Sequence, residues 1–335
     1  MSSNKIIRVI KNPYLIRLFG LYLRFEIRQK KALNQYHKGY TVLPEMPIRV
    51  RVEPTNVCNL KCVMCPNGQP GDVKARGFMS MEVYKSIIDE LRLFPKPIWL
   101  FLYLGGEPLL HKEIIDMIKM AKNAGLNCRF NTNATLLQGD IIDELLNSGL
   151  DCIEFSFDDV SPDEYEAMRV NASYDNTLTN LTRFLERKKE LKLNMPLVTI
   201  SSLRLREKAD YQYEKSYWRF KKLVSDYEVE ENLGMAHLWA GGFHSNKSYN
   251  YKRDMPESKP KCSMPWTDLT INWKGEVVGC CFDLGYDCML GDIKQDTIEH
   301  IWNNEKMVDF RKKLYDGDFD KLKLCKYCSL VWDEI

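Results

Sequence analysis

The feature that most restricts the fold of this chain is the spacing of three cysteines near residue 60. Cys58, Cys62 and Cys65 directly follow Ile48–Val52, whose alternating apolar residues predict a strand. Three thiolates on one loop can each bind a different iron of a [4Fe–4S] cube and leave the fourth iron open. An amino acid that chelates through its amine and carboxylate could occupy that iron. The alternatives are a zinc site, although three thiolates without a fourth ligand make a poor closed set, or cysteines that pack as small apolar side chains.

The chain has eleven cysteines, and most of them fall into two groups, this triplet and a second group between residues 262 and 328. In a reducing compartment such groups indicate metal ligation better than disulfides. No stretch of about 18 apolar residues is free of charge, which argues against a transmembrane helix. No small-residue cleavage site follows the apolar run of residues 15–27, so a signal peptide is not expected. We therefore expect a cytoplasmic protein.

From residue 47 onward, strand-like and helix-like patterns alternate about six times over roughly 190 residues. This alternation predicts an α/β fold whose parallel strands close into a partial (β/α)6 TIM-like barrel. In barrels the chemistry gathers at the C-terminal ends of the strands. A stretch of residues rich in Gly, Asn, Ser, Lys and Pro, 241–260, marks the expected domain boundary. The expected domains are the barrel at 47–240 and a small Cys-rich α+β module at 261–335.

Residues 1–46 form a basic amphipathic segment ahead of the barrel. The first fifty residues carry ten Lys or Arg against Glu26 and Glu45, a local charge of +8 in a chain whose net charge is +2. Apolar residues and arginines recur at roughly helical intervals over residues 6–27. We expect a helix that packs on the barrel or makes peripheral contact with an anionic membrane surface. A nucleic-acid partner is not expected, and salt-dependent RNA binding would revive that alternative.

The cysteine triplet resembles the signature of the radical S-adenosylmethionine (SAM) superfamily, CxxxCxxC in the first βα loop of a partial barrel. Leu104–Pro108 resembles the GGEP motif of that family, in which the glycines let the backbone approach SAM and the carboxylate accepts from the SAM amine. Later stretches resemble the family's TNG, SLDG and YexxR motifs. The resemblance implies SAM contacts at Gly105, Gly106, Glu107, Pro108, Asn133, Ser156 and Arg169.

Some of these stretches depart from the family pattern. Ala134 stands where the TNG motif has its glycine, and Asp159 stands where the SLDG motif has its glycine. Arg169 ends the stretch that resembles YexxR, whose arginine meets the SAM carboxylate in the family. The alternative for Arg169 is a solvated helix residue.

The C-terminal group contains four cysteines around a hairpin predicted at 269–279, with a helix predicted at 297–314. By spacing alone, Cys262, Cys280, Cys325 and Cys328 could hold zinc or a [4Fe–4S] cluster. Cys262–Trp266 and Val277–Cys281 resemble the SPASM domain that follows many radical SAM barrels. The chain ends seven residues after Cys328, which fits the shortened, single-cluster twitch type. The resemblance therefore implies an auxiliary [4Fe–4S] cluster on these four residues.

The resemblance further implies that an external one-electron donor, such as flavodoxin or ferredoxin, drives cleavage of SAM to methionine and a 5′-deoxyadenosyl radical. We expect the radical to take hydrogen from a small carbohydrate- or aminocyclitol-like substrate. The substrate radical could then be oxidised, or it could receive hydrogen from Cys281 and become an epimer. Cys281 and Cys288 could also be cluster ligands or packed thiols. A peptide-modifying enzyme and a non-catalytic iron–sulfur or zinc scaffold are the alternatives.

Overall fold

The computed structural model describes residues 13–67, 74–158, 161–204, 220–235, 262–325 and 328. These residues form one sheet of nine strands, in the order β6-β5-β4-β3-β2-β1-β7-β8-β9. The strands of the barrel are β1 (Arg49–Val52), β2 (Trp99–Leu102), β3 (Asn127–Thr132), β4 (Cys152–Ser156), β5 (Leu197–Arg204) and β6 (Val229–Met235). All six run parallel, and each lies beside its neighbour in sequence. This is the predicted partial barrel.

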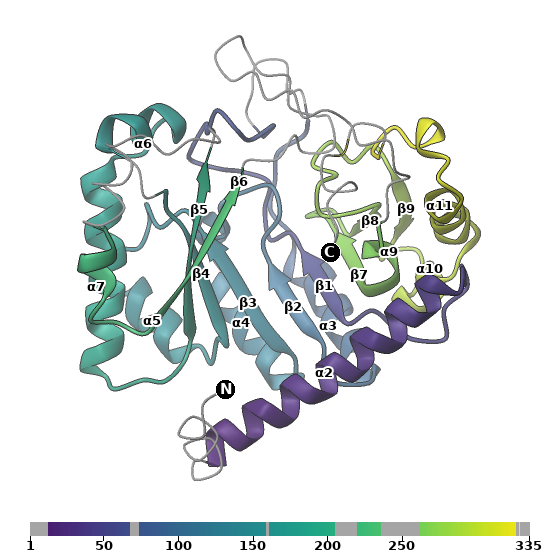
Figure 1. The fold of residues 1–335 in the computed structure, drawn as a ribbon, viewed down its shortest axis with the longest axis horizontal. Coiled ribbons are helices and arrows are strands. Elements are labelled where there is room, and N and C mark those ends of the chain that lie inside the picture. The colour runs from purple at the N-terminus through teal and green to yellow at the C-terminus, as the bar shows by residue number, and fades with distance from the viewer. Residues whose placement is uncertain are drawn as a thin grey trace.

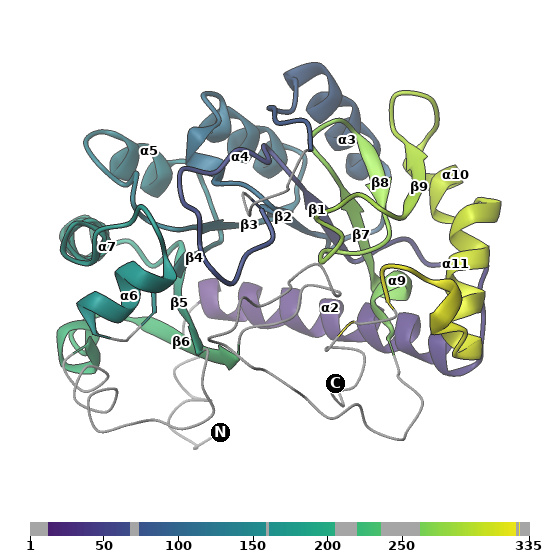
Figure 2. The same cartoon turned by 90° about the horizontal axis from the view of Figure 1, so that it is seen from above.

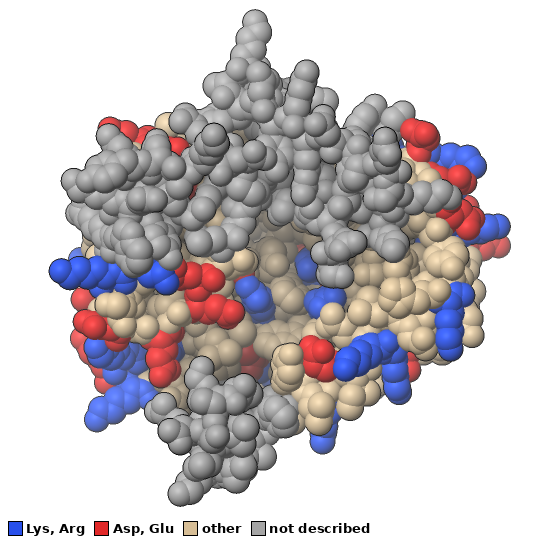
Figure 3. Space-filling view, in the orientation of Figure 1, with Lys and Arg blue, Asp and Glu red and all other residues tan. Residues whose placement is uncertain are grey.

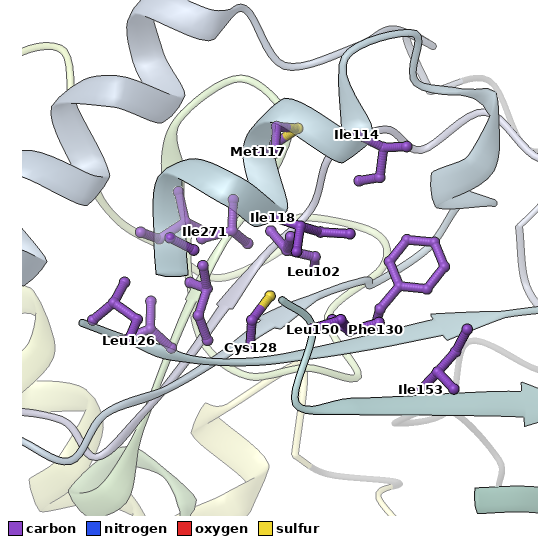
Figure 4. Close-up of a cluster of buried hydrophobic side chains, with 14 of the residues drawn as sticks. Leu102, Ile114, Met117, Ile118, Leu126, Cys128, Phe130, Leu150, Ile153 and Ile271 are labelled. Carbon is purple, nitrogen blue, oxygen red and sulfur yellow. The ribbon is translucent and has the colours of Figure 1, made fainter. Parts of the chain in front are cut away.

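Helices cover the outer face of the curved sheet (Figures 1 and 2). They are α3 (Met81–Leu93), α4 (Ile114–Asn123), α5 (Ile141–Asn147), α6 (Pro162–Met168) and α7 (Tyr174–Glu190), with a short 3-10 turn, η1 (Pro108–Leu110), before α4. Successive strand residues point to opposite faces, and only one face of β1–β4 is fully buried. Figure 4 shows Met117 and Ile118 of α4 over Cys128 and Phe130 of β3. The apolar core therefore lies between the sheet and these helices. The opposite face, called here the inner face, carries most of the polar side chains of these strands together with Trp99 and Phe101 of β2.

The C-terminal module continues the barrel sheet. Strand β7 (Asp268–Ile271) pairs in parallel with β1, and β8 (Glu276–Val278) and β9 (Met289–Asp292) follow in antiparallel fashion. The predicted hairpin is β7–β8, and Gly275 takes a φ of +88° in its turn. The helix predicted at 297–314 is wrong as one element, because the side chain of Asn304 accepts from Met307 N and starts a new helix there.

The remaining elements of the module are α9 (Met264–Thr267), α10 (Ile298–Trp302), α11 (Glu305–Asp316) and the 3-10 turn η3 (Phe319–Lys321). The predicted boundary at 241–260 lies outside the described residues, so the division into domains stays a prediction.

The N-terminal segment contains a long helix, α2 (Pro13–His37), which crosses the molecule beneath β1, β2 and β7 (Figure 1). Its buried Arg28 donates to the carbonyl oxygens of Pro95 (2.6 Å) and Pro97 (2.7 Å). Near the helix end, the ring of Tyr36 packs edge-on against Trp266 at 4.9 Å. The second half of α2 therefore packs on the barrel and on the C-terminal module. Within the described part of the chain, no helix has the length and apolar character needed to cross a membrane.

Candidate functional site

The three cysteines of the first motif lie in the loop that follows β1, at the C-terminal end of the barrel strands. Two backbone hydrogen bonds join this loop to the last residue of α6 and to the segment that follows it. Lys61 N donates to Val170 O (3.0 Å), and Val63 N donates to Met168 O (2.9 Å). Arg169 lies between these two acceptors. The fold therefore brings the YexxR-like stretch against the cysteine loop, although about 100 residues of chain separate them.

Burial changes the protonation of the thiols in this loop. Burial raises the pKa of Cys58 to about 12 and that of Cys65 to about 11, and the neighbouring thiols add to both rises. The Arg169 guanidinium opposes the rise that burial causes in the pKa of Cys62. Thiolates are the form that binds iron, so metal binding here would release the protons that these thiols retain near pH 7.

No three His, Cys, Asp or Glu side chains of the described residues are arranged to hold a single metal ion. A four-iron cube offers a separate iron to each thiolate, so its ligands need not meet at one point. The donor set of three thiols on one loop therefore fits the cube.

Arg169 is only 6% exposed and is not a solvated helix residue. Its Nε donates to Asp158 Oδ2 at 2.6 Å and its Nη2 to Asp158 Oδ1 at 3.1 Å, a two-point ion pair. Asp158 also accepts from Leu203 N of β5 at 2.8 Å. The guanidinium is thus held at the ends of β4 and β5, beside Cys62.

Gly105 and Gly106 follow β2 and lie against the backbone that leads into the cysteine loop. A Cβ atom on Gly106 would be 2.2 Å from Thr55 O and 2.6 Å from Val57 O, so no other residue fits. The next amide, Glu107 N, donates to Val57 O at 2.8 Å. The chain's own packing therefore requires Gly106, in addition to any approach to SAM that the sequence predicted.

Glu107 is a buried acceptor that ties this loop to the end of β3. Its Oε1 accepts from Leu109 N (3.0 Å) and Thr132 Oγ1 (2.8 Å), and its Oε2 accepts from Asn133 N (2.8 Å). Burial raises its pKa to about 7, against the three hydrogen bonds. Each carboxylate oxygen can accept about two hydrogen bonds, so Oε2 has capacity for a further donor such as an amine.

The TNG-like stretch lies beside Glu107. Asn133 Nδ2 donates to Asn59 Oδ1 in the cysteine loop at 3.0 Å. Ala134 has a φ of +62°, a conformation that favours glycine and explains why the family motif has Gly at this place. Ser156 ends β4 with its side chain on the inner face. Asp159 lies outside the described residues.

The inner face carries charged residues that the sequence analysis missed. Arg51 forms an ion pair with Asp268 of β7 and lies over the ring of Phe101, 5.0 Å from its centroid. Arg129 of β3 forms an ion pair with Glu154 of β4. The signal was present in the alternation of Arg and Val in β1, which places both arginines of that strand opposite the apolar core. Figure 3 shows a recess in this side of the molecule with Lys or Arg atoms on its walls.

The predicted auxiliary ligands come together in the C-terminal module. Burial raises the pKa of Cys262 to about 12, with contributions from Cys328 and Cys281 nearby. Burial also raises the pKa of Cys325, with contributions from Cys262, Cys328 and Cys288. These cysteines, together with Cys280, therefore lie close enough to shift one another's pKa, and their role as ligands stays a prediction.

The pKa of Cys281 responds to a charged residue of β1 as well as to its neighbouring cysteine. A hydrogen bond with Cys280 and the charge of Arg51 both lower the pKa of Cys281, against its burial. Because the charge of Arg51 acts on this thiol, Cys281 lies in the neighbourhood of the charged residues of β1.

Comparison with protein-family models gives two matches. Residues 52–204 match the Radical SAM superfamily, and residues 262–329 match SPASM, an iron-sulfur cluster-binding domain.

Among curated relatives, the Fe-coproporphyrin III synthase of Methanosarcina barkeri is 31% identical over 127 residues, which are 38% of this chain and 31% of that protein. The tungsten-containing aldehyde ferredoxin oxidoreductase cofactor-modifying protein of Pyrococcus furiosus is 21% identical over 293 residues, 78% of this chain and 82% of that one. The S-adenosyl-L-methionine-dependent 2-deoxy-scyllo-inosamine dehydrogenase of Niallia circulans is 34% identical over 70 residues, which are 21% of this chain and 28% of that protein. The chain thus spans less than a third of two of these relatives and most of the third.

Several solved structures share the fold, BtrN and SuiB among them. BtrN in complex with AdoMet and 2-DOIA superposes with a TM-score of 0.59 at 19% identity, covering 86% of this chain and 94% of that one. Streptococcus suis SuiB bound to precursor peptide SuiA superposes with a TM-score of 0.56 at 15% identity, and the match covers 90% of this chain and 73% of that one. At these identities the likeness concerns the fold alone.

Proposed function

The chain belongs to the radical SAM superfamily and carries a SPASM domain towards its C-terminus, and from this premise we propose that it takes hydrogen from a small polar, carbohydrate- or aminocyclitol-like substrate. SAM on a [4Fe–4S] cluster supplies, after one-electron reduction, the radical that removes the hydrogen atom. A flavodoxin- or ferredoxin-like donor is the proposed source of the electron.

The residues present fit these cofactors. Cys58, Cys62 and Cys65 would hold the cube, with Arg169 beside it to balance thiolate charge. Glu107 would accept from the SAM amine through the remaining capacity of Oε2. Gly105, Pro108, Asn133 and Ser156 stay proposed contacts at the same end of the sheet.

The observation that carries the proposal about the substrate is a pair of buried polar atoms without a hydrogen-bond partner in the described part of the chain. These are Arg129 Nε, a donor, and Asn131 Oδ1, an acceptor. Both belong to inner-face positions of β3. A hydroxyl group both donates and accepts, so a hydroxyl-bearing ligand satisfies such a pair. The flanking ion pairs, Arg51–Asp268 and Arg129–Glu154, leave this face charged but nearly balanced.

The position of Cys281 near Arg51 supports a proposed role in the second half of the reaction. In an epimerisation, its S–H bond would break, the hydrogen atom would pass to the substrate carbon radical, and a new C–H bond would form. The sulfur radical left behind would need one electron from the external donor and one proton from solvent. In a dehydrogenation, the substrate radical would instead lose one electron to an auxiliary [4Fe–4S] cluster on the C-terminal cysteines and one proton to solvent, and Cys281 would have no part in the chemistry.

The experiment that tests this function offers the reduced, reconstituted enzyme SAM together with 2-deoxy-scyllo-inosamine, the compound named in one relative, and in parallel a short peptide. We expect 5′-deoxyadenosine in amounts that match consumption of the aminocyclitol. In deuterated water, one deuterium on an inverted carbon identifies epimerisation, and Cys281→Ala should abolish it while SAM cleavage continues. An oxidised product without deuterium identifies dehydrogenation. Modification of the peptide alone contradicts the proposal in favour of peptide maturation.

A further inference from the structure

The carboxylate of Glu53 joins three segments that are far apart in the sequence. Its Oε1 accepts from Gly105 N at 3.0 Å, and its Oε2 accepts from Trp273 N at 3.1 Å and from the hydroxyl of Tyr286 at 2.7 Å. Gly105 belongs to the loop that precedes Glu107, and Trp273 lies in the β7–β8 turn. Tyr286 lies in the loop that connects Cys281 with Cys288. One side chain thus connects the loop assigned to SAM with the loop of auxiliary cysteines.

Glu53 is completely buried, and burial raises its pKa. Three hydrogen-bond donors offset the cost of removing a carboxylate from water. Replacing buried charged groups by apolar ones is often neutral or stabilising in proteins, so stability alone does not explain a charge at this place.

The partner of Glu53 in the auxiliary loop is held in a strained conformation. Tyr286 has a φ of +57°, a region that a bulky side chain rarely adopts. Asp283 stabilises this loop by accepting from Asp287 N (2.8 Å) and Cys288 N (2.9 Å). Strain that is maintained by surrounding hydrogen bonds is typical of functional segments. Here it directs the hydroxyl of Tyr286 at Glu53.

We propose that Glu53 is a positioning residue that couples the loop of Cys281–Cys288 to the loop of Gly105–Glu107. The two loops are also in direct contact, because a Cβ on Gly105 would lie 3.3 Å from Leu284 Cδ2. The carboxylate of Glu53 accepts from both Tyr286 and the amide of Gly105, so a displacement of Tyr286 also moves that amide. Gly105 is two residues before Glu107. The order of the auxiliary loop therefore sets the geometry of the SAM loop. This inference rests on the family assignment and is independent of the substrate proposed above.

The test is Tyr286→Phe in the full-length, reconstituted protein. This change removes one hydroxyl and retains the ring and the backbone conformation. Tyr84→Phe is the matched control, because the Tyr84 hydroxyl is also buried and donates to Met117 O at 2.8 Å, in the core beneath α4. We expect Tyr286→Phe to speed amide hydrogen exchange at residues 103–107 about ten-fold. SAM affinity should weaken about three- to ten-fold. The control should change neither quantity.

Two results would overturn the proposal. The first is a Tyr286→Phe protein whose Tm falls as in the control while exchange at 103–107 and SAM affinity stay at wild-type values. The second is a Glu53→Gln protein that folds and shows wild-type exchange at 103–107 and wild-type SAM affinity. The amide of the new side chain has an N–H group facing the donors that bond to Glu53, so it cannot make all three hydrogen bonds. By linkage, SAM should slow exchange around Tyr286 in the wild type, and an unaffected loop also counts against coupling. None of these measurements requires a substrate to be turned over.

Discussion

At the scale of single residues, the hydrogen bonds of Glu107 and its burial have opposite effects on its pKa. It accepts three hydrogen bonds that fix the loop after β2, and these favour the ionised form. Its complete burial favours the neutral form and wins, because the pKa rises to about 7 from an ordinary value of 4.5. Glu107→Ala would leave three buried donors without acceptors, so it would lower stability together with any effect on SAM. Glu107→Gln changes the charge with less disturbance.

The raised pKa of Glu107 predicts a pH dependence of stability. An acid whose pKa is raised by folding stabilises the protein fully below its unfolded pKa of 4.5, and this stabilisation is lost as the pH rises through about 7. Between pH 5.5 and 8, the free energy of unfolding of the wild type should therefore fall by about 2 kcal/mol relative to Glu107→Gln. Urea denaturation of both SAM-free proteins at the two pH values measures this difference. Parallel pH profiles would show that Glu107 is ionised throughout.

The sequence located this loop through its motif but not through its contacts. The letters of Gly105–Pro108 predicted a turn that meets SAM, and the contact of Gly106 with Thr55 O could not be anticipated. That contact depends on how β1 and β2 pair, which is a property of the sheet. Glu53 was missed for the same reason, since its partners lie 52, 220 and 233 residues away.

At the scale of elements, local patterns predicted the strands that have strong periodicity. The alternation of Arg and Val predicted β1, and the turn at Gly275 predicted the β7–β8 hairpin. The parallel pairing of β7 with β1 had no local signal, because its strands are about 220 residues apart and their register depends on tertiary packing. On the inner face of this pair, Asp268 accepts from both Arg49 and Arg51.

The seam between β1 and β7 should depend on this shared carboxylate. Asp268 is buried, and Arg51 and Arg49 hold its pKa below the ordinary value despite that burial. Asp268→Asn would leave two largely buried guanidinium groups without their counter-charge, at a cost of about 3–5 kcal/mol in the free energy of unfolding. Asp143→Asn is the control, because it breaks the exposed pair with Arg187 and should cost less than about 1 kcal/mol. Urea denaturation at pH 7 measures the free energy of unfolding of both variants. Equal losses would show that the buried ion pairs of Asp268 stabilise the protein no more than the exposed pair does.

At the scale of the whole molecule, the strands of the barrel and those of the C-terminal module form one continuous sheet (Figures 1 and 2). The first group of cysteines follows β1, and the second surrounds β7–β9, which extend the sheet from the edge of β1. The sequence separated the groups by spacing but gave no relation between them. In the structure the loop of Cys281–Cys288 and the loop of Gly105–Glu107 share the acceptor Glu53, and α2 packs on the barrel and the module together. The chain therefore behaves as one framework around two metal sites.

This arrangement predicts two independent clusters in one folded protein. Anaerobic reconstitution should give about eight irons per chain, as two cubes of four. Changing Cys58, Cys62 and Cys65 together to Ala should leave about four irons and abolish SAM cleavage, because the auxiliary cysteines keep their own fold around β7.

Cys128→Ala is the control, since Cys128 lies in the apolar core under α4 (Figure 4) and should leave the iron content unchanged. Iron and zinc analysis with electron paramagnetic resonance of each variant measures the outcome. About four irons and one tightly bound zinc in the wild type would assign the C-terminal cysteines to zinc, and loss of all iron in the triple variant would show that the clusters are not independent.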